Sequence, residues 1–413
     1  MMAKGRAGEE REAAGAAQGA CGQTPLRVLI VAPSMDILGG QAVQAERLMD
    51  GLKQEPSLSV SFLPINPRLP GVLRHLQAIK YVRTVVTSVF YLATLLARVG
   101  RYDVIHIFSA SYFSFLLAPT PAMLIARLYG RKIVLNYHSG EAEDHLTRWR
   151  RTALPLLRLA HLIVVPSGYL VDVFARFNLK SRAIFNHLET GRFRQRERRV
   201  LRPVFLSNRN LEAHYNVACV LRAFALIQQR LSTARLIVAG DGSQRGELEA
   251  LARKLNLKQT EFVGSVTPEK MVELYDAADI YLNASEIDNM PLSILEAYAS
   301  GLPVVTSDAG GIPYIVTNEE TGLLVPKGDH KALAAAALRL LENPELALRM
   351  ATRAAAECRK YGWPVVRDEW LKLYYGMARE ATESPEQSAA GSSQKEVGCE
   401  QKTALRGEEV VSR

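Results

Sequence analysis

Short apolar runs alternate with amphipathic segments along most of the chain. In the first half, near-continuous apolar runs lie at residues 26–32, 59–63, 104–108, 132–137 and 162–166. Segments in which apolar residues recur every three or four positions separate them, at residues 41–52, 72–99, 112–129 and 147–160. Continuous apolar runs are typical of strands buried on both faces of a parallel sheet, and the wider spacing is typical of helices. The first half therefore predicts a sheet covered by helices.

The second half repeats this alternation. Strands are expected at residues 203–207, 234–239, 261–263, 279–283 and 303–306. Helices are expected at residues 217–231, 243–256, 268–277, 291–300 and 329–342. The alternation predicts an α/β fold of two doubly wound Rossmann-like domains. They are expected to face a central cleft, because open parallel sheets bind ligands beyond the carboxyl ends of their strands.

Composition marks the ends of the domains. The stretch 192–202 holds six arginines and is too polar for a core, so it is the predicted linker between a first domain at 25–196 and a second at 197–362. Residues 1–24 are rich in Ala, Gly and Glu, and residues 381–413 are rich in Ser, Gln and Glu. Both ends are predicted to be disordered tails.

The overall composition is that of a globular protein. Apolar residues make up 48% and charged residues 23% of the chain, which excludes a mostly disordered, collagen-like or coiled-coil protein. The four cysteines form no CxxC pair, so neither a zinc site nor a disulfide framework is expected: Cys21, Cys219, Cys358 and Cys399. The start of the chain has no secretory signal pattern. Residues 84–97 come nearest to a membrane span but fall short of the roughly 18–20 apolar residues needed. We expect a cytoplasmic protein.

The excess basic charge is confined to the first half. Residues 25–200 hold 24 Lys or Arg against 11 Asp or Glu, whereas residues 201–380 hold 20 against 22. Such a surface suits anionic lipid, a pyrophosphate-bearing substrate or nucleic acid, or it is a solvated face without a partner. Nucleic acid is not expected, because no aromatic-interleaved basic strand, recognition helix or zinc module accompanies the charge.

The most informative candidate chemistry lies between residues 285 and 297, after the predicted strand 279–283. Pro291 suits the first position of a helix, where its missing N–H costs nothing. A helix starting there directs free backbone N–H groups at the cleft, which favours phosphate. Asp288 in the loop and Glu296 in the second turn then suit a ligand with sugars on both sides of a pyrophosphate. The alternative is that Asp288 only caps the helix and Glu296 is only solvated.

Six segments in the second half carry a family resemblance. They are residues 207–211, which include Arg209, and then 238–242, 262–264, 285–305, 309–313 and 321–325. In this order they resemble the nucleotide-binding half of family 4 glycosyltransferases, which are retaining, nucleotide-sugar-dependent enzymes of the GT-B fold. The first half is similar more loosely, through Gly39 and Gly40. The resemblance implies a first domain on the acceptor side, a second domain that binds the donor, and a terminal helix at 363–380 that packs back on the first domain.

The resemblance also implies roles in binding the donor. Glu296 is expected to bind the ribose hydroxyls and Asp288 to contact the donor sugar. The intervening segment is expected to lie against sugar and diphosphate: Asn289, Met290, Pro291 and Leu292.

Four further residues complete the implied site. Arg209 is expected to hold the diphosphate, and Gly39 and Gly40 to lie close to sugar and phosphate. His138 is expected to face the reacting sugar, which with Asp288 and Arg209 makes up the implied catalytic set. The alternative for His138, at the end of strand 132–137, is a hydrogen-bonded structural residue, and His106 is expected to be core.

The sequence departs from the family pattern at the donor site. Asp288 stands where Glu is usual, and Asn289, Met290 and Pro291 replace a Gly-Phe-Gly-like run. His214 stands where a second diphosphate cation, Lys, is frequent, and Tyr314 replaces a frequent Glu. Either these residues mark a working subgroup, or the donor site is weakened.

The predicted function is that of a retaining, hexosyl-type glycosyltransferase. It would move a sugar from a nucleoside diphosphate to a glycan or lipid-linked acceptor, in polysaccharide or glycolipid biosynthesis. No cofactor or metal is expected; the cluster Glu141, Glu143, Asp144 and His145 is interpreted as acceptor-side or solvated residues. The alternatives are a sugar-nucleotide epimerase and a non-catalytic, sugar-nucleotide-binding subunit.

The segment 73–101 mixes arginines with apolar runs. An apolar body with basic flanks lies well in a bilayer interface beside anionic lipid, so a peripheral contact with the cytoplasmic membrane is one hypothesis. The other is a long core helix of the first domain with a basic exposed edge.

Overall fold

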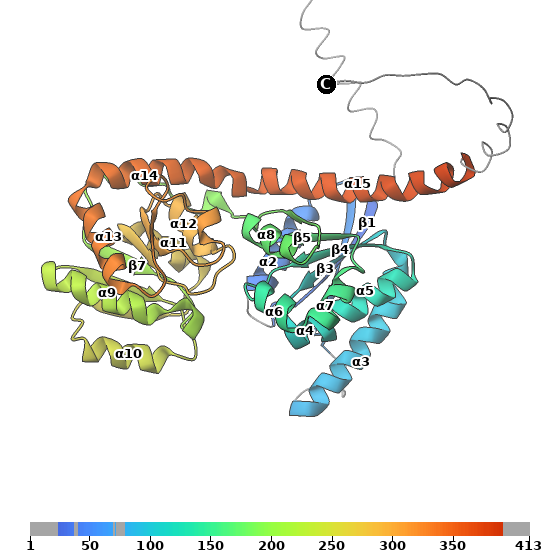
Figure 1. Cartoon of the computed structure of the whole chain (residues 1–413), viewed down its shortest axis with the longest axis horizontal. Coiled ribbons are helices and arrows are strands. Elements are labelled where there is room, and N and C mark those ends of the chain that lie inside the picture. Colours follow the sequence, from blue (N-terminus) through green and yellow to red (C-terminus); the bar gives the residue numbers. More distant parts are fainter. Residues whose placement is uncertain (1–23, 37–39, 69–70, 72–78, 391–413) are drawn as a thin grey trace, which may run out of the picture.

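The chain forms two α/β domains that lie side by side (Figure 1). The computed structural model describes residues 24–36, 40–68, 71 and 79–390. Within these residues each domain is built on a six-stranded sheet in which all neighbouring strands run parallel. The predicted pair of doubly wound domains is confirmed.

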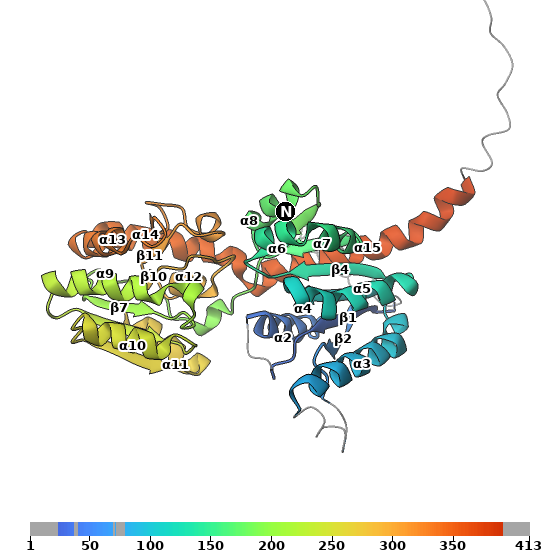
Figure 2. The ribbon, with the colours of Figure 1, turned by 60° about the horizontal axis from the view of Figure 1, so that its bottom comes forward.

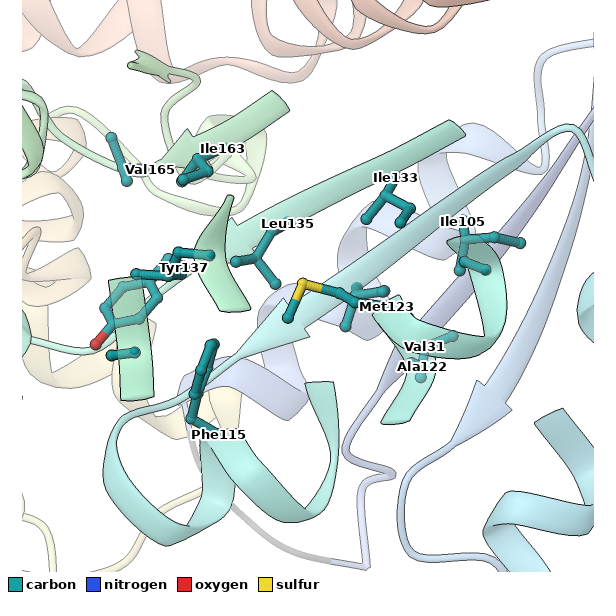
Figure 3. Close-up of a cluster of buried hydrophobic side chains, with 14 of the residues drawn as sticks. Val31, Ile105, Phe115, Ala122, Met123, Ile133, Leu135, Tyr137, Ile163 and Val165 are labelled. Carbon is teal, nitrogen blue, oxygen red and sulfur yellow. The ribbon is translucent and has the colours of Figure 1, made fainter. Parts of the chain in front are cut away.

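The N-terminal sheet has the strand order β2-β1-β3-β4-β5-β6. Its strands are β1 (Leu26–Ala32), β2 (Leu58–Pro64), β3 (Val104–Ser109), β4 (Lys132–Tyr137), β5 (Leu162–Val165) and β6 (Ser181–Ala183). Its helices are α2 (Gly40–Leu52), α3 (Lys80–Arg98), α4 (Tyr112–Leu117), α5 (Pro119–Leu128), α6 (Ala142–Arg148), α7 (Arg150–Leu157) and α8 (Gly168–Arg176). Leu29 and Leu135 face the core shared with α3 to α8, where Figure 3 shows Phe115 and Met123 close to Leu135. The alternate residues, such as Val28, pack with α2 on the other face.

The C-terminal sheet has the strand order β12-β11-β10-β7-β8-β9. Its strands are β7 (Val204–Ser207), β8 (Arg235–Ala239), β9 (Thr260–Gly264), β10 (Ile280–Asn283), β11 (Val304–Ser307) and β12 (Leu323–Val325). Its helices are α9 (Val217–Arg230), α10 (Arg245–Lys254), α11 (Pro268–Ala277), α12 (Leu292–Ala299), α13 (His330–Glu342) and α14 (Pro344–Glu357).

Two of the predicted helices are interrupted. The segment 112–129 breaks at Ala118, because Pro119 has no N–H to donate and restricts the backbone of the residue before it. The segment 147–160 divides at Trp149, and its first helix, α6, begins earlier than expected. The part of the predicted 72–99 helix at residues 72–78 lies outside the described residues, and α3 begins at Lys80.

Helix α15 (Trp363–Ala390) follows the C-terminal domain but packs on the N-terminal one, as predicted (Figure 1). It continues past the predicted end at 380, so the expectation of a disordered tail is wrong for residues 381–390. Trp370 and Tyr374 are buried in the face of the N-terminal sheet that also carries α2. The Tyr374 hydroxyl lies 2.6 Å from Nδ1 of His106 in β3, and that histidine has no exposed surface. The core interpretation of His106 is therefore confirmed.

The chain passes between the domains twice, and the two passages touch. Leu188, on the way into the C-terminal domain, donates its backbone N–H to the carbonyl of Tyr361 at 2.8 Å. It also forms an isolated parallel bridge with Gly362, immediately before α15. The two connections therefore lie against each other rather than at separate points of the interface.

The Arg-rich stretch 192–202 is not wholly at the surface. Arg198 is only 4% exposed and donates to the carbonyls of Tyr275, Ala278 and Ser300. These carbonyls lie at the C-terminal ends of α11 and α12, where they lack partners within the helix. The expectation that this stretch is too polar for the interior is wrong at Arg198, because one guanidinium satisfies several such carbonyls at once.

Candidate active site

A cleft of about 470 Å³ opens between the carboxyl ends of the two sheets. Most of the residues predicted for the site line it, from both domains: Gly40, His138, Arg209, Asp288, Asn289, Met290, Pro291 and Leu292. Gly39 lies outside the described residues. Glu296 is not among the lining residues; it lies on α12, one turn beyond Leu292 of the cleft, and is partly exposed.

Arg209 is held in place on three sides. Its Nη2 donates to Oδ2 of Asp288 at 2.5 Å, and its Nη1 donates to Oγ of Ser293 at 3.0 Å. The guanidinium carbon lies 4.1 Å from the centre of the Tyr215 ring. The side chains of Arg209 and Asp288 are 12% and 9% exposed, so this ion pair is shielded from water on most sides. The pairing holds the Arg209 guanidinium in one orientation, and its Nε has no partner among the described residues and is free to donate to an anion in the cleft.

The backbone behind Arg209 depends on Gly240. This residue has a φ of +123°, and a Cβ placed there would lie 2.5 Å from the carbonyl oxygen of Arg209. A side chain at this position would therefore displace the backbone at Arg209.

The loop that carries Asp288 is also supported by a glycine of a neighbouring loop. A Cβ on Gly311 would lie 1.9 Å from the carbonyl oxygen of Asn289, and the N–H of Gly311 donates to the carbonyl of Asp288 at 2.8 Å. The glycines at 310–311 therefore let a second loop close directly on the backbone that carries Asp288.

Burial raises the pKa of both predicted carboxyl groups. For Asp288 the charge of Arg209 opposes this effect, and for Glu296 a hydrogen bond from Tyr275 opposes it. The Tyr275 hydroxyl donates to Oε2 of Glu296 at 2.8 Å and itself accepts from Nδ2 of Asn208 at 2.6 Å. Glu296 is thus oriented by a buried chain of polar groups.

His138 lies on the opposite wall, directly after β4. Its ring stacks on Phe108 with 5.1 Å between centroids, and its carbonyl accepts a 3.4 Å hydrogen bond from Asn289 across the cleft. Burial lowers the pKa of His138 to about 4, so the ring is neutral near pH 7.

Several buried polar atoms of the cleft residues have no hydrogen-bond partner. They come from both domains: Gln44 Nε2, His138 Nε2, Arg209 Nε and Asn289 Oδ1. A buried polar atom without a partner costs about 1–3 kcal/mol, so such atoms are rare unless a ligand satisfies them. Their concentration in one cleft indicates a polar ligand that touches both walls.

Helix α12 begins one residue later than predicted. Pro291 precedes it in an extended conformation (φ −66°, ψ 109°), and Leu292 is its first helical residue. The first N–H groups of the helix have no intrahelical acceptor, which still makes this end suitable for phosphate.

The departures from the family pattern have different surroundings. His214 lines the cleft, and its ring centroid lies 4.1 Å from that of Tyr215, the residue under Arg209. Tyr314 instead reaches the other domain, where its hydroxyl donates to Asp172 of α8. His214 therefore lines the cleft together with the departures at 288–291, whereas Tyr314 does not.

The segment 141–145 is divided between the core and the cleft, so the acceptor-side or solvated interpretation is wrong for His145. His145 is fully buried, with Nδ1 2.8 Å from the Tyr137 hydroxyl, while Glu141 lines the cleft. In the part of the chain that the structure describes, no three His, Cys, Asp or Glu side chains are placed to hold a metal ion.

Sequence reasoning missed several polar residues of the cleft, among them two glutamines and an asparagine. Gln41 and Gln44 project from the first turns of α2, and Asn186 follows the short strand β6. The glutamines could have been found from their place after Gly40, whereas nothing in the local pattern distinguishes Asn186.

The fold is the GT-B arrangement of sugar transferases. Anabaena HepE, solved in complex with UDP-glucose, is similar with a TM-score of 0.68 and 17% identity over 85% of this chain and 100% of that one. Sucrose-phosphate synthase from Thermosynechococcus elongatus is similar with a TM-score of 0.68 and 19% identity over 85% of this chain and 99% of that one.

Sequence comparison places the chain in a family. The model of glycosyltransferase family 4 matches residues 38–192, and that of glycosyl transferases group 1 matches residues 191–357. The chain belongs to the family 4 type of glycosyltransferases, as the six segments predicted.

Individual relatives differ in what their names say they do. Sulfoquinovosyl transferase of Arabidopsis thaliana is 26% identical over 68% of this chain, and the match spans 59% of that protein. Glycogen synthase of Mycobacterium tuberculosis is 28% identical over 64% of this chain and 67% of its own length. Phosphatidyl-myo-inositol mannosyltransferase of Mycobacterium leprae is 29% identical over 44% of this chain and 48% of its own.

Proposed function

We propose that this protein transfers a hexosyl unit from a nucleoside diphosphate sugar to a glycan or lipid-linked acceptor, with retention of anomeric configuration. The observation that carries the proposal is the shielded Arg209, fixed by Asp288 and Ser293 beside the first turn of α12. A cation and a helix N-terminus in one cleft are suited to a diphosphate.

The chemistry then follows from where charge develops. As the bond between sugar and diphosphate breaks, negative charge grows on the leaving phosphate, and Arg209 and the N–H groups of α12 stabilise it. We propose that no metal ion is needed for this step. The acceptor hydroxyl attacks from the face that the diphosphate leaves, and its proton passes to the phosphate, so no nucleophilic side chain is required.

The opposite wall supplies orientation. His138 is neutral, and its Nε2 lacks a partner, so it can hydrogen-bond a sugar hydroxyl at the reacting centre. Asp288 contacts the donor sugar and Glu296 the ribose in this proposal. Closure of the domains excludes water from the reacting bond.

The relatives support a hexosyl donor and two classes of acceptor. HepE was solved with UDP-glucose, and the names of the curated relatives include a glycogen synthase and a phosphatidylinositol mannosyltransferase. We therefore propose a role in polysaccharide or glycolipid biosynthesis in the cytoplasm.

The first experiment screens nucleotide sugars by thermal shift and follows transfer with the one that stabilises the protein most. Arg209→Ala is expected to lower the transfer rate about 100-fold or more, the usual effect of removing one group that stabilises developing charge. Arg245→Ala, an exposed arginine paired with Asp241 and Glu249, is the matched control.

Three outcomes would contradict parts of the proposal. Wild-type rates in both Arg209→Ala and Glu296→Ala would show that the site is elsewhere. Loss of activity in EDTA would show that a metal is required. An inverted anomeric centre in the product, seen by NMR, would exclude retention.

A further inference from the structure

Helix α3 has apolar residues on two faces, and only one face is covered. Tyr91 and Leu95 are buried in the N-terminal core. The other face carries five exposed apolar side chains, spaced three and four residues apart: Val82, Val85, Val89, Leu92 and Leu96. This spacing aligns them in one row along the helix, the α3 stripe. Val85 and Val89 are 63% and 61% exposed, so the described residues leave the stripe uncovered.

Neighbouring helices add to this surface. Leu117 of α4 and Leu124 and Leu128 of α5 are 52%, 50% and 76% exposed. Helices α3 and α5 touch, and both views show α3 along the outer edge of the N-terminal domain beside α5 (Figures 1 and 2). Exposed apolar surface gathered in one region marks an interaction site.

The charge of the segment from α3 to the start of β4 is almost entirely positive. Residues 80–132 contain seven Lys or Arg and one acidic residue, Asp103. Asp103 is already paired with Arg27, its Oδ1 lying 2.7 Å from Nη2 of that arginine. Apolar side chains flanked by unneutralised basic residues are complementary to the surface of an anionic bilayer.

A groove of about 800 Å³ runs between α3 and the segment that follows β2. Its walls carry Arg68 and Arg83 together with the hydroxyls of Thr84 and Ser88. Arg68 is paired with Asp36, whereas Arg83 makes no ion pair within the described residues. Two arginines and several hydroxyls beside an apolar helix suit a phosphate group attached to a hydrocarbon chain.

The groove lies near the cleft. Asp36 lines the groove and Gly40 lines the cleft. They are four residues apart in the chain, so their Cα atoms are separated by at most about 14 Å. A headgroup in the groove therefore lies within a few sugar units of the site where the donor is proposed to bind.

We propose that the α3 stripe docks on an anionic bilayer and that the groove beside it binds the phosphate headgroup of a lipid from that bilayer. The helix lies along the surface rather than across it, because its Tyr91 face is packed on the domain. The expectation that residues 84–97 fall short of a membrane span is wrong by length and composition alone, because the apolar segment is Val82–Arg101; its buried face, however, is part of the core. The proposal rests on the proposed function only in taking the bound lipid as the acceptor side of the reaction.

The test is flotation of the full chain with vesicles of phosphatidylcholine alone, and of equal parts phosphatidylcholine and phosphatidylglycerol. The wild type is expected to float with the anionic vesicles and to be released by high salt. Val85→Asp with Val89→Asp should weaken binding at least about tenfold, since two valines leave the apolar interface. Val200→Asp, at an exposed valine of the linker, is the matched control and should bind as the wild type.

The groove has its own variants. Arg68→Gln with Arg83→Gln should weaken binding to anionic vesicles about fivefold per arginine, while Arg230→Gln on α9 should change nothing. Glycerol phosphate in excess should weaken the wild type toward the level of the double variant, because it competes for the groove.

Each contrary result overturns a stated part. No flotation of the wild type, binding that high salt does not release, or equal binding of stripe and control variants would refute the docking surface. Equal binding of Arg68→Gln/Arg83→Gln and Arg230→Gln would refute the headgroup site. Stabilisation by the donor nucleotide is measured on the same variants and should be unchanged; its absence in the wild type would instead count against the proposed function.

Discussion

The two domains share one architecture but place charge and apolar surface differently. The N-terminal domain encloses uncharged histidines, His106 and His145, and exposes twelve large apolar side chains among the described residues. The C-terminal domain encloses ion pairs around Asp279 and Arg209 and, apart from Val200 in the linker, exposes only two among the described residues, Ile287 and Tyr314. Both of these face the N-terminal domain or the cleft.

The difference indicates that the two domains interact with different kinds of molecule. Charged groups inside the C-terminal domain are already oriented, so an anionic ligand meets them without reorganisation. The basic and apolar groups of the N-terminal domain lie outside, where they are available to a partner. Changes made in the C-terminal domain and in the N-terminal domain are therefore expected to have different effects.

The largest effect is expected in the C-terminal domain from Gly311→Ala. The new Cβ would collide with the Asn289 carbonyl and displace the loop that carries Asp288, so the transfer rate should fall about 100-fold. The measurement is steady-state transfer with the preferred donor. Gly246→Ala on α10, where a Cβ meets nothing within 4 Å, is the control and should be fully active. A wild-type transfer rate in Gly311→Ala would show that transfer does not depend on the position of the loop that carries Asp288.

A smaller effect is expected in the N-terminal domain on acidification. Burial lowers the pKa of His106 to about 3, so below pH 6.5 the unfolded chain binds a proton that the folded chain does not. His106 should therefore lower the free energy of unfolding by about 2 kcal/mol as the pH is lowered from 7 to 5. His106→Gln is expected to be less stable at pH 7 but to show a flatter dependence in denaturant unfolding.

The buried carboxyl groups of the C-terminal domain should respond with the opposite sign. Because burial raises the pKa of Asp288 and Glu296, the folded domain takes up protons before the unfolded chain does as the pH falls. Lowering the pH into the range where these two groups titrate therefore increases their contribution to the stability of the folded state. Hydrogen exchange at pH 7 and pH 5 should show the N-terminal sheet losing more protection than the C-terminal one. Equal losses would remove this contrast.

The smallest effect is expected at the contact between the domains. Tyr314→Phe removes the hydrogen bond to Asp172 of α8, and because both groups are exposed the loss should be about 0.5–1 kcal/mol, or two- to fivefold in the KM for donor. Tyr375→Phe, which removes a hydrogen bond to the carbonyl of Ser57 on the N-terminal side, is the control. An unchanged KM would show that this contact does not influence closure.

The repeated alternation of runs predicted both sheets, because buried parallel strands are continuous in apolar residues. The three-residue strands β6 and β12 and the helices α8 and α14 were not predicted. A strand such as β6, with three half-buried residues, has too few apolar positions for any periodicity to be detected.

The candidate site was predicted unevenly for a similar reason. Arg209, Asp288 and the first turn of α12 lie in segments with a recognisable pattern, and the structure brings them together. Asn186, Gln44 and the support that Gly311 gives to Asn289 depend on contacts between distant parts of the chain. The sequence also gave no sign that Arg198 would lie inside, because its acceptors are helix ends far away in sequence.

The paired passages at Leu188 and Gly362 have a mechanical consequence. Two interdomain connections that are hydrogen-bonded to each other at one point resist translation of one domain past the other. They still permit rotation about the axis that passes through this point. The two domains are then expected to open and close by rotation about this hinge. Helix α15, which is packed on the N-terminal domain, moves together with that domain.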